Sequence, residues 1–458
     1  MKKVTISLFL LFALSMLHGC KSGSSNSTST VRLVNGTSSS LDMYWSGSGS
    51  ASAIASGVPY GNASNSLGIS AGVSSIALAS SGSSPSSGTP YSFSGGYSYT
   101  MLAYQTYPSG PSTPSLQVAQ LIDNQLLPVF GEGLIGVADY SGAGSLDVYI
   151  WPSVPPGTSP SFAWASGISG LTKYSTVPVP VPPGNASYRI QVTGAGAGYG
   201  NDVRLDIPSV TIGNQQILTL VLTPTIGGGL VDGLLVLQQG QVPQSSQNVV
   251  TSYKNGSARV RVAASFVAPG NPPITSATAN GVSILGLGSS LSLGSVSSYV
   301  AVPSTSITPP ITINGITISV SLFCASATAT ATPGQDLTLL VVGIASPPNY
   351  CLLPDDNTLA ASGHAKLRLV NGVNNFTGSI LLTYGGLYQQ NAAFGAASTT
   401  TSVPIPGGSP YALFESPIGG GSLGSPALQA QGVYSVFMLG DTSAASAVLS
   451  TDHLYQEH

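Results

Sequence analysis

Alternating apolar and polar residues recur in four places along the chain, and each place predicts two short strands joined by a bend. In residues 31–45, Val31 and Leu33 alternate with Arg32, a turn-forming cluster follows, and a second alternating run ends at Trp45. A period of two is typical of a half-buried β-strand. The related stretches are residues 135–151, 258–281 and 366–384.

The spacing of these four stretches, roughly a hundred residues, matches the size of a domain and is too long for a solenoid repeat. Long apolar runs of helical period are not evident in the sequence. We therefore expect an all-β protein of four tandem β-sandwich-like (immunoglobulin-like) domains. Their predicted ranges are residues 31–133, 134–256, 257–363 and 364–458.

Local signals add detail to this outline. Asn314-Gly315 lies between two alternating runs and predicts a hairpin in which Ile313 faces Ile316. The VPVPVPP run at residues 177–183 fits only an edge strand or an extended polyproline-like segment, because proline cannot donate to a sheet. Residues 194–200, GAGAGYG, predict a hairpin tip rather than a phosphate loop, and Asp232-Gly233 predicts a turn.

The N-terminal residues resemble a bacterial lipoprotein signal. Two lysines precede an apolar run, residues 4–17, that suits a signal peptide better than a membrane span. Residues 1–19 would be removed, leaving an acylated Cys20 and a Ser-rich tether over residues 20–30. Lys21 after the cysteine indicates the outer membrane in lipoproteins of this kind. The alternative is an ordinary secretory signal with a chance cysteine.

Composition narrows the possible partners. Only 6% of residues are charged, against about a quarter in ordinary globular proteins, and 56 glycines and 33 prolines are present. The formal net charge is −3, and no basic patch is available for nucleic acid. A membrane reached through the lipid anchor, an envelope polymer or another envelope protein remains as a possible partner.

Two cysteines besides Cys20 lie in the third predicted domain. In an exported chain Cys324 and Cys351 are expected to form a disulfide, which would stabilise the fold by about 2–4 kcal/mol. Cys324 shares the phase of Ile316 and Ile318, which predicts that it points into the core. Two buried free thiols are the alternative, while a metal or redox site lacks further ligands.

The motif in residues 32–35 and 41–44, an alternating strand with Asn-Gly followed by Leu-Asp-x-Tyr, returns in residues 146–149. It resembles the bacterial family catalogued as domain of unknown function 4397. The resemblance covers nearly all of the chain after Cys20 and is loosest in the third copy, which lacks Leu-Asp-x-Tyr. It implies tandem β-sandwich domains in exported proteins and lipoproteins, and it brings no catalytic residues.

Residues that could carry chemistry are few. Beyond the signal, the only histidines are His364, His453 and His458, in a predicted linker and a tail, which does not suit a hydrolytic triad. Residues 68–72 match G-x-S-x-G without the strand-to-helix setting of a nucleophile. Asp42 and Asp147 occupy equivalent places and indicate either a shared ligand or turn acceptors. No cofactor or metal motif is present.

Aromatic residues offer one binding hypothesis. Tyr97, Tyr99, Trp45 and Trp151 could stack on sugar rings, or they could pack within strands. We therefore expect a non-enzymatic cell-envelope lipoprotein that acts as a structural, adhesive or protein-interaction module. The alternative is a polysaccharide-binding surface protein.

Overall fold

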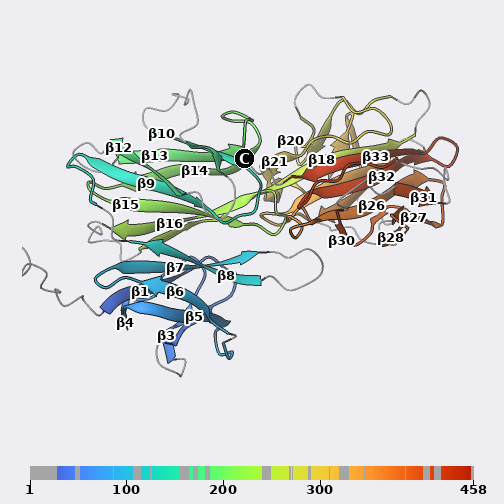
Figure 1. Cartoon of the computed structure of the whole chain (residues 1–458). Helices are drawn as coiled ribbons and strands as arrows, with labels where there is room; N and C mark the ends of the chain where they lie inside the picture. The colour runs from blue at the N-terminus through green and yellow to red at the C-terminus, as the bar shows by residue number, and fades with distance from the viewer. Residues whose placement is uncertain are drawn as a thin grey trace, which may run out of the picture. The chain divides into compact units, whose positions relative to one another are not determined.

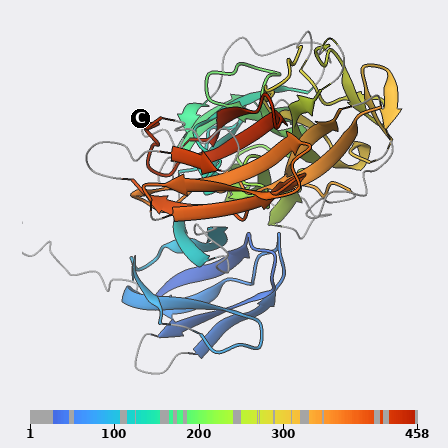
Figure 2. The same cartoon turned by 90° about the vertical axis from the view of Figure 1, so that its right-hand side faces the viewer.

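The computed structural model confirms the prediction of an all-β fold. It describes residues 28–46, 52–85, 87–106, 115–123, 126–153, 165–168, 174–180, 186–239, 249–267, 270, 272–286, 290–308, 310–318, 330–344, 347–386, 388–405, 413–416 and 424–454. Within these ranges the regular structure is β-strand, apart from one 3-10 turn, η1 (Ser304–Ser306). The strands form sandwich-like pairs of sheets (Figures 1 and 2).

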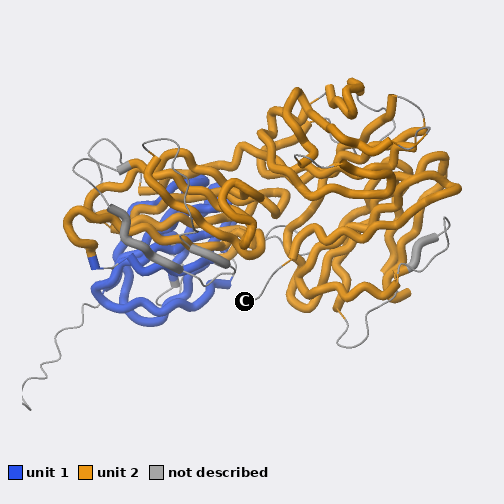
Figure 3. The backbone as a smooth tube through the Cα atoms, turned by 90° about the horizontal axis from the view of Figure 1, so that it is seen from above, with its two compact units in different colours: residues 1–103, 118–126 blue, residues 104–117, 127–458 orange. Residues whose placement is uncertain are grey.

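The chain divides into two compact units (Figure 3). Unit 1 comprises residues 1–103 and 118–126, and unit 2 comprises residues 104–117 and 127–458. The first sandwich belongs mainly to unit 1, while the second, third and fourth sandwiches together belong to unit 2. Three of the four sandwiches are therefore packed closely enough to count as one body.

The first sandwich has two four-stranded sheets, of order β4-β1-β7-β8 and β3-β2-β5-β6. Its opening strand starts at Thr28, so three residues predicted for the tether already pair in the sheet. The strands are β1 (Thr28–Asn35), β2 (Leu41–Ser46), β3 (Ser52–Val58), β4 (Leu67–Ser70), β5 (Gly72–Ser80), β6 (Thr89–Phe93), β7 (Ser98–Thr106) and β8 (Ser115–Ile122).

The second sandwich has sheets of order β11-β10-β13-β14 and β12-β9-β15-β16-β17. Residues 177–180 of the proline-rich segment lie in β12, an edge strand as predicted, and residues 181–183 lie outside the described residues. Asp232-Gly233, by contrast, is not a turn. Both residues lie in β16, where Gly233 pairs with Leu222, and a Cβ on Gly233 would approach Leu205 and Leu220 at 3.1 Å. The strands are β9 (Glu132–Asp139), β10 (Leu146–Pro152), β11 (Ala165–Ile168), β12 (Tyr174–Pro180), β13 (Ala186–Gly194), β14 (Val203–Ile212), β15 (Ile217–Pro224), β16 (Val231–Gln239) and β17 (Val250–Tyr253).

The third sandwich has sheets of order β21-β18-β24-β25 and β20-β19-β22-β23. The Asn-Gly hairpin forms in the predicted register, with Ile313 opposite Ile316 and left-handed φ values of 48° at Asn314 and 78° at Gly315. Ile316 is nevertheless 38% exposed, although Ile318 is buried. The strands are β18 (Ser257–Phe266), β19 (Ala277–Ala279), β20 (Val282–Ser283), β21 (Val300–Pro303), β22 (Ile311–Ile313), β23 (Ile316–Ile318), β24 (Asp336–Gly343) and β25 (Asn349–Asp355).

The fourth sandwich has one sheet of order β29-β26-β32-β33, with β30 also paired to β26, and a second of order β28-β27-β31. The strands are β26 (His364–Asn374), β27 (Ser379–Tyr384), β28 (Tyr388–Ala393), β29 (Ala396–Ala397), β30 (Thr401–Pro404), β31 (Leu413–Ser416), β32 (Val433–Asp441) and β33 (Ser446–His453).

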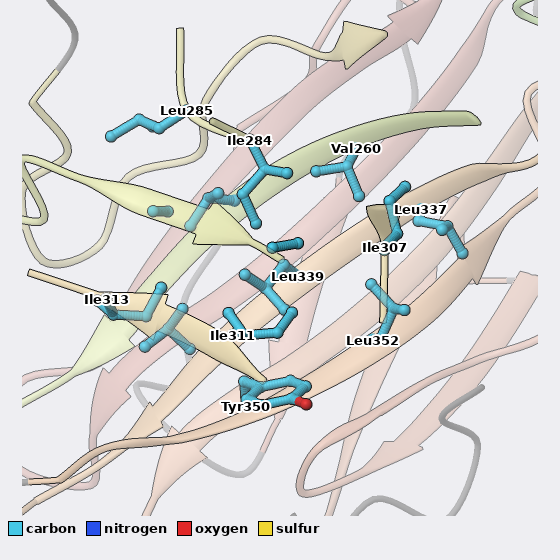
Figure 4. Close-up of a cluster of buried hydrophobic side chains, with 14 of the residues drawn as sticks. Val260, Ile284, Leu285, Ile307, Ile311, Ile313, Leu337, Leu339, Tyr350 and Leu352 are labelled. Carbon is cyan, nitrogen blue, oxygen red and sulfur yellow. The ribbon is translucent and has the colours of Figure 1, made fainter. Parts of the chain in front are cut away.

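All four sandwiches share one topological feature. The opening strand lies parallel to a later strand of its own sheet, in the pairs β1 with β7, β9 with β15, β18 with β24, and β26 with β32. Alternate residues of these strands face the space between the two sheets. In the third sandwich Val260, Ile311 and Leu337 meet there (Figure 4). The opposite faces of the same strands carry the polar residues described next.

Candidate functional site: a buried ionic interface between sandwiches

Three of the four opening strands carry an arginine at the same register position. Each arginine lies opposite a hydroxyl residue on the parallel neighbouring strand, and its Nε donates a hydrogen bond to that hydroxyl at 2.7–2.9 Å. These pairs lie on the sheet face that points away from the sandwich core. The three pairs are Arg32–Thr100, Arg261–Thr338 and Arg368–Ser435.

A carboxylate completes each pair. In the first sandwich the Thr100 hydroxyl donates to Asp123 Oδ2 at 2.8 Å, and Arg32 Nη2 lies 3.3 Å from the same oxygen. The corresponding carboxylates are Asp355 in the third sandwich and Asp452 in the fourth. Asp123 and Asp355 are thus both partners of an arginine on an opening strand.

The third and fourth sandwiches exchange these carboxylates. Arg261 of β18 donates to Asp452 of the fourth sandwich through Nη1 and, at 2.9 Å, through Nη2. Arg368 of β26 donates through Nη2 to Asp355 of the third sandwich at 2.6 Å. The exchange is reciprocal, so the two sheets meet as the two halves of a symmetric dimer do, within one chain.

Burial makes this pairing obligatory. The side chains of Arg261, Arg368, Asp355 and Asp452 are at most 3% exposed. Burial alone would raise the pKa of Asp355, but Arg368 and Arg261 outweigh it and hold that pKa below its ordinary value. Two positive and two negative charges cancel, so the cluster is neutral as a whole. Removing one partner would leave a buried charge without compensation, which typically costs 3–5 kcal/mol.

Tyr299 extends the cluster toward a second ion pair. The guanidinium carbons of Arg259 and Arg261 lie 4.6 Å from the centre of its ring, and its hydroxyl donates to Asp355 Oδ2. Arg259 in turn makes a two-pronged pair with Asp336, with its Nε donating to Oδ1 at 2.8 Å. Stacked guanidinium groups of this kind are favoured over an electron-rich ring face.

Apolar residues surround the ionic core of the interface. The ring of Phe437 lies 4.8 Å from the Arg261 guanidinium carbon. Beyond it, the Ser265 hydroxyl donates to the Gly372 carbonyl at 2.5 Å and accepts from the Gly440 N–H at 2.7 Å, which joins β18 to the fourth sandwich. The buried apolar residues shared by the two sandwiches are Ala263, Leu340, Val342, Cys351, Leu353, Val370, Phe437 and Leu439.

A glycine loop joins the second sandwich to the same body. Gly227, Gly228 and Gly229 lie between β15 and β16, and the Gly227 N–H donates to the Gly334 carbonyl of the third sandwich at 2.8 Å. No side chain fits here: a Cβ on Gly228 would lie 2.4 Å from Thr358 N, and one on Gly229 would overlap the Arg259 guanidinium. The three glycines therefore permit close backbone contact between sandwiches.

His453 lies near this junction. Its Nδ1 is 2.5 Å from the Asn357 carbonyl oxygen, and its ring would contact a Cβ placed on Gly144 of the second sandwich. Burial lowers the pKa of His453 to about 4, and the charges of Arg204 and Arg259 act in the same direction. The imidazole is therefore neutral at pH 7 and serves as a packing group rather than as a proton carrier.

The second sandwich departs from the arginine pattern. Gly136 occupies the arginine position, opposite Thr219, and the Thr219 hydroxyl donates to Gln238 Oε1 at 2.6 Å instead of to a carboxylate. The hydroxyl is kept while both charges are lost. The pattern is therefore a property of the first, third and fourth sandwiches.

The four aromatic residues predicted as ligand contacts differ in exposure and belong to two compact units. Tyr97 is 43% exposed and Trp45 is half-buried, whereas Tyr99 is 4% exposed and accepts a hydrogen bond from the Ser94 N–H. Trp151 is 9% exposed in the second sandwich. The packing alternative describes Tyr99 and Trp151 well.

Other candidate residues have structural partners. Asp42 accepts from the N–H groups of Gly57 and Gly82, and Asp147 accepts from the Gly196 N–H, so both are acceptors for turns as the second alternative proposed. Gly196 belongs to the predicted hairpin tip, which connects β13 and β14. Ser70 of the G-x-S-x-G match ends β4 rather than following a strand into a helix.

The cysteines are only partly described. Cys351 is buried in β25, where it faces the interface with the fourth sandwich, and it is disulfide-bonded. Cys20 and Cys324 lie outside the described residues, so lipidation at Cys20 and the pairing of Cys324 with Cys351 stay predictions. Among the described residues no three His, Cys, Asp or Glu side chains converge as metal ligands. The same residues include no helix with the length and hydropathy of a membrane span.

Comparison with known proteins does not place the chain in a family. No protein-family model matches the sequence, and no curated protein matches it. Among solved structures, the chain is similar to "The Bacillus anthracis TIE protein" at 11% identity, over 91% of this chain and 69% of that chain, with a TM-score of 0.13. A TM-score this low supports no argument about fold or function.

The sequence did contain a signal for the ionic interface. Arg32, Arg261 and Arg368 stand at the same place in three copies of the opening strand, in a chain with only 12 lysines and arginines. Alternation alone assigns them to an outward, solvated face. What alternation cannot show is that two of those outward faces cover each other.

Proposed function

We propose that this chain is a non-enzymatic cell-envelope lipoprotein, held in the outer membrane by an acylated Cys20, that acts as a structural, adhesive or protein-interaction module. One observation carries the proposal. The buried arginine and aspartate side chains between the third and fourth sandwiches pair with one another and hold the two sandwiches together. A charge-paired, solvent-excluded cluster has no group free to exchange protons with a substrate, whereas it is well suited to holding a composite surface in one geometry.

The low charge of the chain supports a role in contact rather than in catalysis or nucleic-acid binding. The formal net charge is −3 and only 6% of residues are charged, so the chain has few charged groups to place on its surface. The partners that fit are an envelope polymer or another envelope protein. A polyanion such as nucleic acid would require a basic surface.

Anchoring is tested first. In the native host, mass spectrometry of the membrane fraction should find Cys20 acylated, and Cys20→Ser should move the protein to the soluble fraction. An unchanged distribution would reject the lipid anchor.

Contact is tested by proximity labelling from the C-terminus. The anchored protein should label a reproducible set of envelope components, and Asp452→Asn, which weakens the interface, should change that set while the protein remains in the membrane. A labelled set identical to that of an unrelated lipoprotein of similar abundance would contradict a specific contact role.

A second candidate function, polysaccharide binding, is favoured by one specific observation. On the outer face of the second sandwich Tyr199 stands edge-on over Trp151 at 5.0 Å, and Arg189 lies 5.7 Å from the Trp151 ring centre. Arg189 pairs with Asp206, and both side chains are more than a third exposed. The half-buried ring of Tyr199 lies on the glycine-rich tip beside the exposed donors of Arg189 and acceptors of Asp206. This arrangement matches the alternating apolar and hydroxyl faces of a sugar.

The sugar hypothesis has its own readout. Envelope polysaccharide should shift the tryptophan fluorescence of the wild-type chain through Trp151. Tyr199→Ala should raise the half-saturation concentration of the polysaccharide at least about tenfold, because a stacking contact is lost. Tyr97→Ala, at an exposed tyrosine of the first sandwich, is the matched control. Equal effects of the two substitutions, or no shift, would exclude this site.

A further inference from the structure

Exposed apolar side chains gather at one end of the first sandwich. Val73 is 73% exposed, Tyr97 43%, Ile122 50% and Leu126 93%. Isolated exposed apolar residues are common on soluble proteins, but a cluster at one end of a domain indicates a contact surface. We call these four residues the tether end, because the predicted tether joins β1 at this end of the sandwich.

Strand register places the tether end where the N-terminal segment enters the sandwich. Thr28, the first residue of β1, pairs with Ser70, the last residue of β4. The turn to β5 follows immediately, so Val73 lies beside the start of β1. On the other side of β1, the Thr30 N–H donates to the Tyr97 carbonyl at 3.0 Å.

The last strand of the sandwich leaves at the same end. β7 is parallel to β1, and β8 follows β7 in sequence and runs back toward this end, where the Asp123 N–H donates to the Ser98 carbonyl at 2.9 Å. Ser98 is paired with Thr30. Ile122 therefore lies at the entry edge, and Leu126 is only three residues beyond Asp123.

This end carries no exposed charge. Residues 28–126 contain three charged side chains, Arg32, Asp42 and Asp123, and these are 8%, 6% and 7% exposed. Approaching a low-dielectric phase is costly for charged groups and favourable for apolar ones. The first sandwich can therefore meet such a phase without desolvating a charge.

The length of the preceding chain sets how far this end can stand from the predicted anchor. Seven residues lie between Cys20 and Thr28, and the eight Cα-to-Cα steps from Cys20 to Thr28 span at most about 28 Å when fully extended. An acyl group on Cys20 would thus keep the tether end within reach of the bilayer surface at all times.

We propose that the tether end rests in the interfacial layer of the bilayer that holds the lipid anchor. This inference rests on the proposed anchoring. Leu126 and Val73 enter the boundary between head groups and acyl chains, while Tyr97 lies at head-group level, where tyrosine is favoured.

Lipid quenching of an introduced tryptophan tests the contact. Leu126→Trp is read in vesicles of phosphatidylethanolamine and phosphatidylglycerol with brominated acyl chains, and the parent protein supplies the background of the natural tryptophans. The matched control is Ser38→Trp, an exposed residue in the turn between β1 and β2 at the opposite end. We expect the Leu126→Trp signal to fall at least about twofold and the Ser38→Trp signal to stay unchanged, because bromine quenches only at the depth of the acyl chains.

The test is made independent of acylation in the host. The chain from residue 21 onward is held on the same vesicles by an N-terminal histidine tag and a chelating lipid. If Cys20 proves unmodified in cells but Leu126→Trp is still quenched on the tethered chain, lipid contact by the tether end is supported and acylation of Cys20 is rejected. If neither tryptophan is quenched on securely tethered protein, the tether end does not contact lipid, and a protein partner becomes the occupant to seek.

Discussion

Replacing Asp139 by asparagine should stabilise the second sandwich at neutral pH. Asp139 ends β9 and is 3% exposed. Its Oδ1 accepts hydrogen bonds from the Ser141 N–H at 2.9 Å and the Ser141 hydroxyl at 2.6 Å, but its buried Oδ2 has no hydrogen-bond partner among the described residues. Burial raises the pKa of Asp139 to about 6, although the two hydrogen bonds from Ser141 oppose the rise.

The magnitude follows from the two protonation equilibria. The pKa of Asp139 is about 6 in the folded chain against an ordinary 3.8, so the folded state binds more protons than the unfolded state between these values. Folding free energy is therefore lost as pH rises from about 4 to about 6. At 1.36 kcal/mol per pKa unit the loss is about 3 kcal/mol at pH 7.

Two other sandwiches show what the position favours. Asn35 and Asn371 occupy the same place, three residues after Arg32 and Arg368. Their Oδ1 atoms accept backbone N–H groups as Asp139 does, while their Nδ2 atoms donate to backbone carbonyls. Asparagine keeps the acceptor of Asp139 and replaces the unpaired oxygen with a neutral donor.

The assay is urea unfolding followed by tyrosine and tryptophan fluorescence, to which Trp151 of the second sandwich contributes. Asp139→Asn should raise the free energy of unfolding by about 1–3 kcal/mol at pH 7.5, and the gain should shrink as pH falls and vanish near pH 3, where the wild-type carboxyl is protonated in both states. Asp206→Asn, in an exposed ion pair of the same sandwich, should change stability by less than about 1 kcal/mol. A destabilising Asp139→Asn, or a gain independent of pH, would refute the reasoning.

Three further predictions concern the interface. Asp452→Asn should lower the free energy of unfolding by about 3 kcal/mol because it deprives buried Arg261 of a carboxylate, and a loss below about 1 kcal/mol in urea unfolding would show that the exchange adds little. His453 should make unit 2 acid-sensitive, because its folded pKa of about 4 lies below the ordinary 6.5. The contribution of His453 to the free energy of unfolding is complete above pH 6.5 and falls by up to about 3 kcal/mol toward pH 4. His453→Gln should flatten this pH dependence in urea unfolding. Gly228→Ala should destabilise more than Gly196→Ala, since both have φ near +80° but only Gly228 faces backbone within 2.4 Å; equal thermal shifts would remove the close-contact explanation.

Much of the fold follows from the sequence because it depends on local pattern. The alternation around Val31 and Leu33 and the Asn314-Gly315 turn both specify strands through nearest neighbours. The turn prediction at Asp232-Gly233 is wrong because turn propensity is also local. Gly233 is needed in a strand because of residues distant in sequence, Leu205 in the opposite sheet and Leu220 on the neighbouring strand.

The interface could not be predicted in the same way. Alternation shows that Arg261 and Arg368 point away from their own cores, but not that each reaches a carboxylate in the other sandwich. These contacts depend on how whole sheets pack together, and the periodicity of a single strand carries no information about sheet packing. The recurrence of arginine at one position in a chain poor in charge was the available clue, and it indicated importance without indicating a partner.

The exchanged ion pairs act more through specificity than through stability. A buried ion pair adds little net free energy, because desolvation offsets the attraction, but an unmatched buried charge is strongly unfavourable. A sheet like that of the second sandwich, with Gly136 and Gln238 in place of arginine and aspartate, would remove the two-pronged contact of Arg261 with Asp452 and leave Arg261 only the Asp355 carboxylate of its own sandwich, at 3.3 Å. Four sandwiches of one topology and nearly uncharged surface have many sheet faces that could cover one another. The exchanged contacts therefore favour pairing of the third sandwich with the fourth over pairing with the second, which has neither charge to exchange.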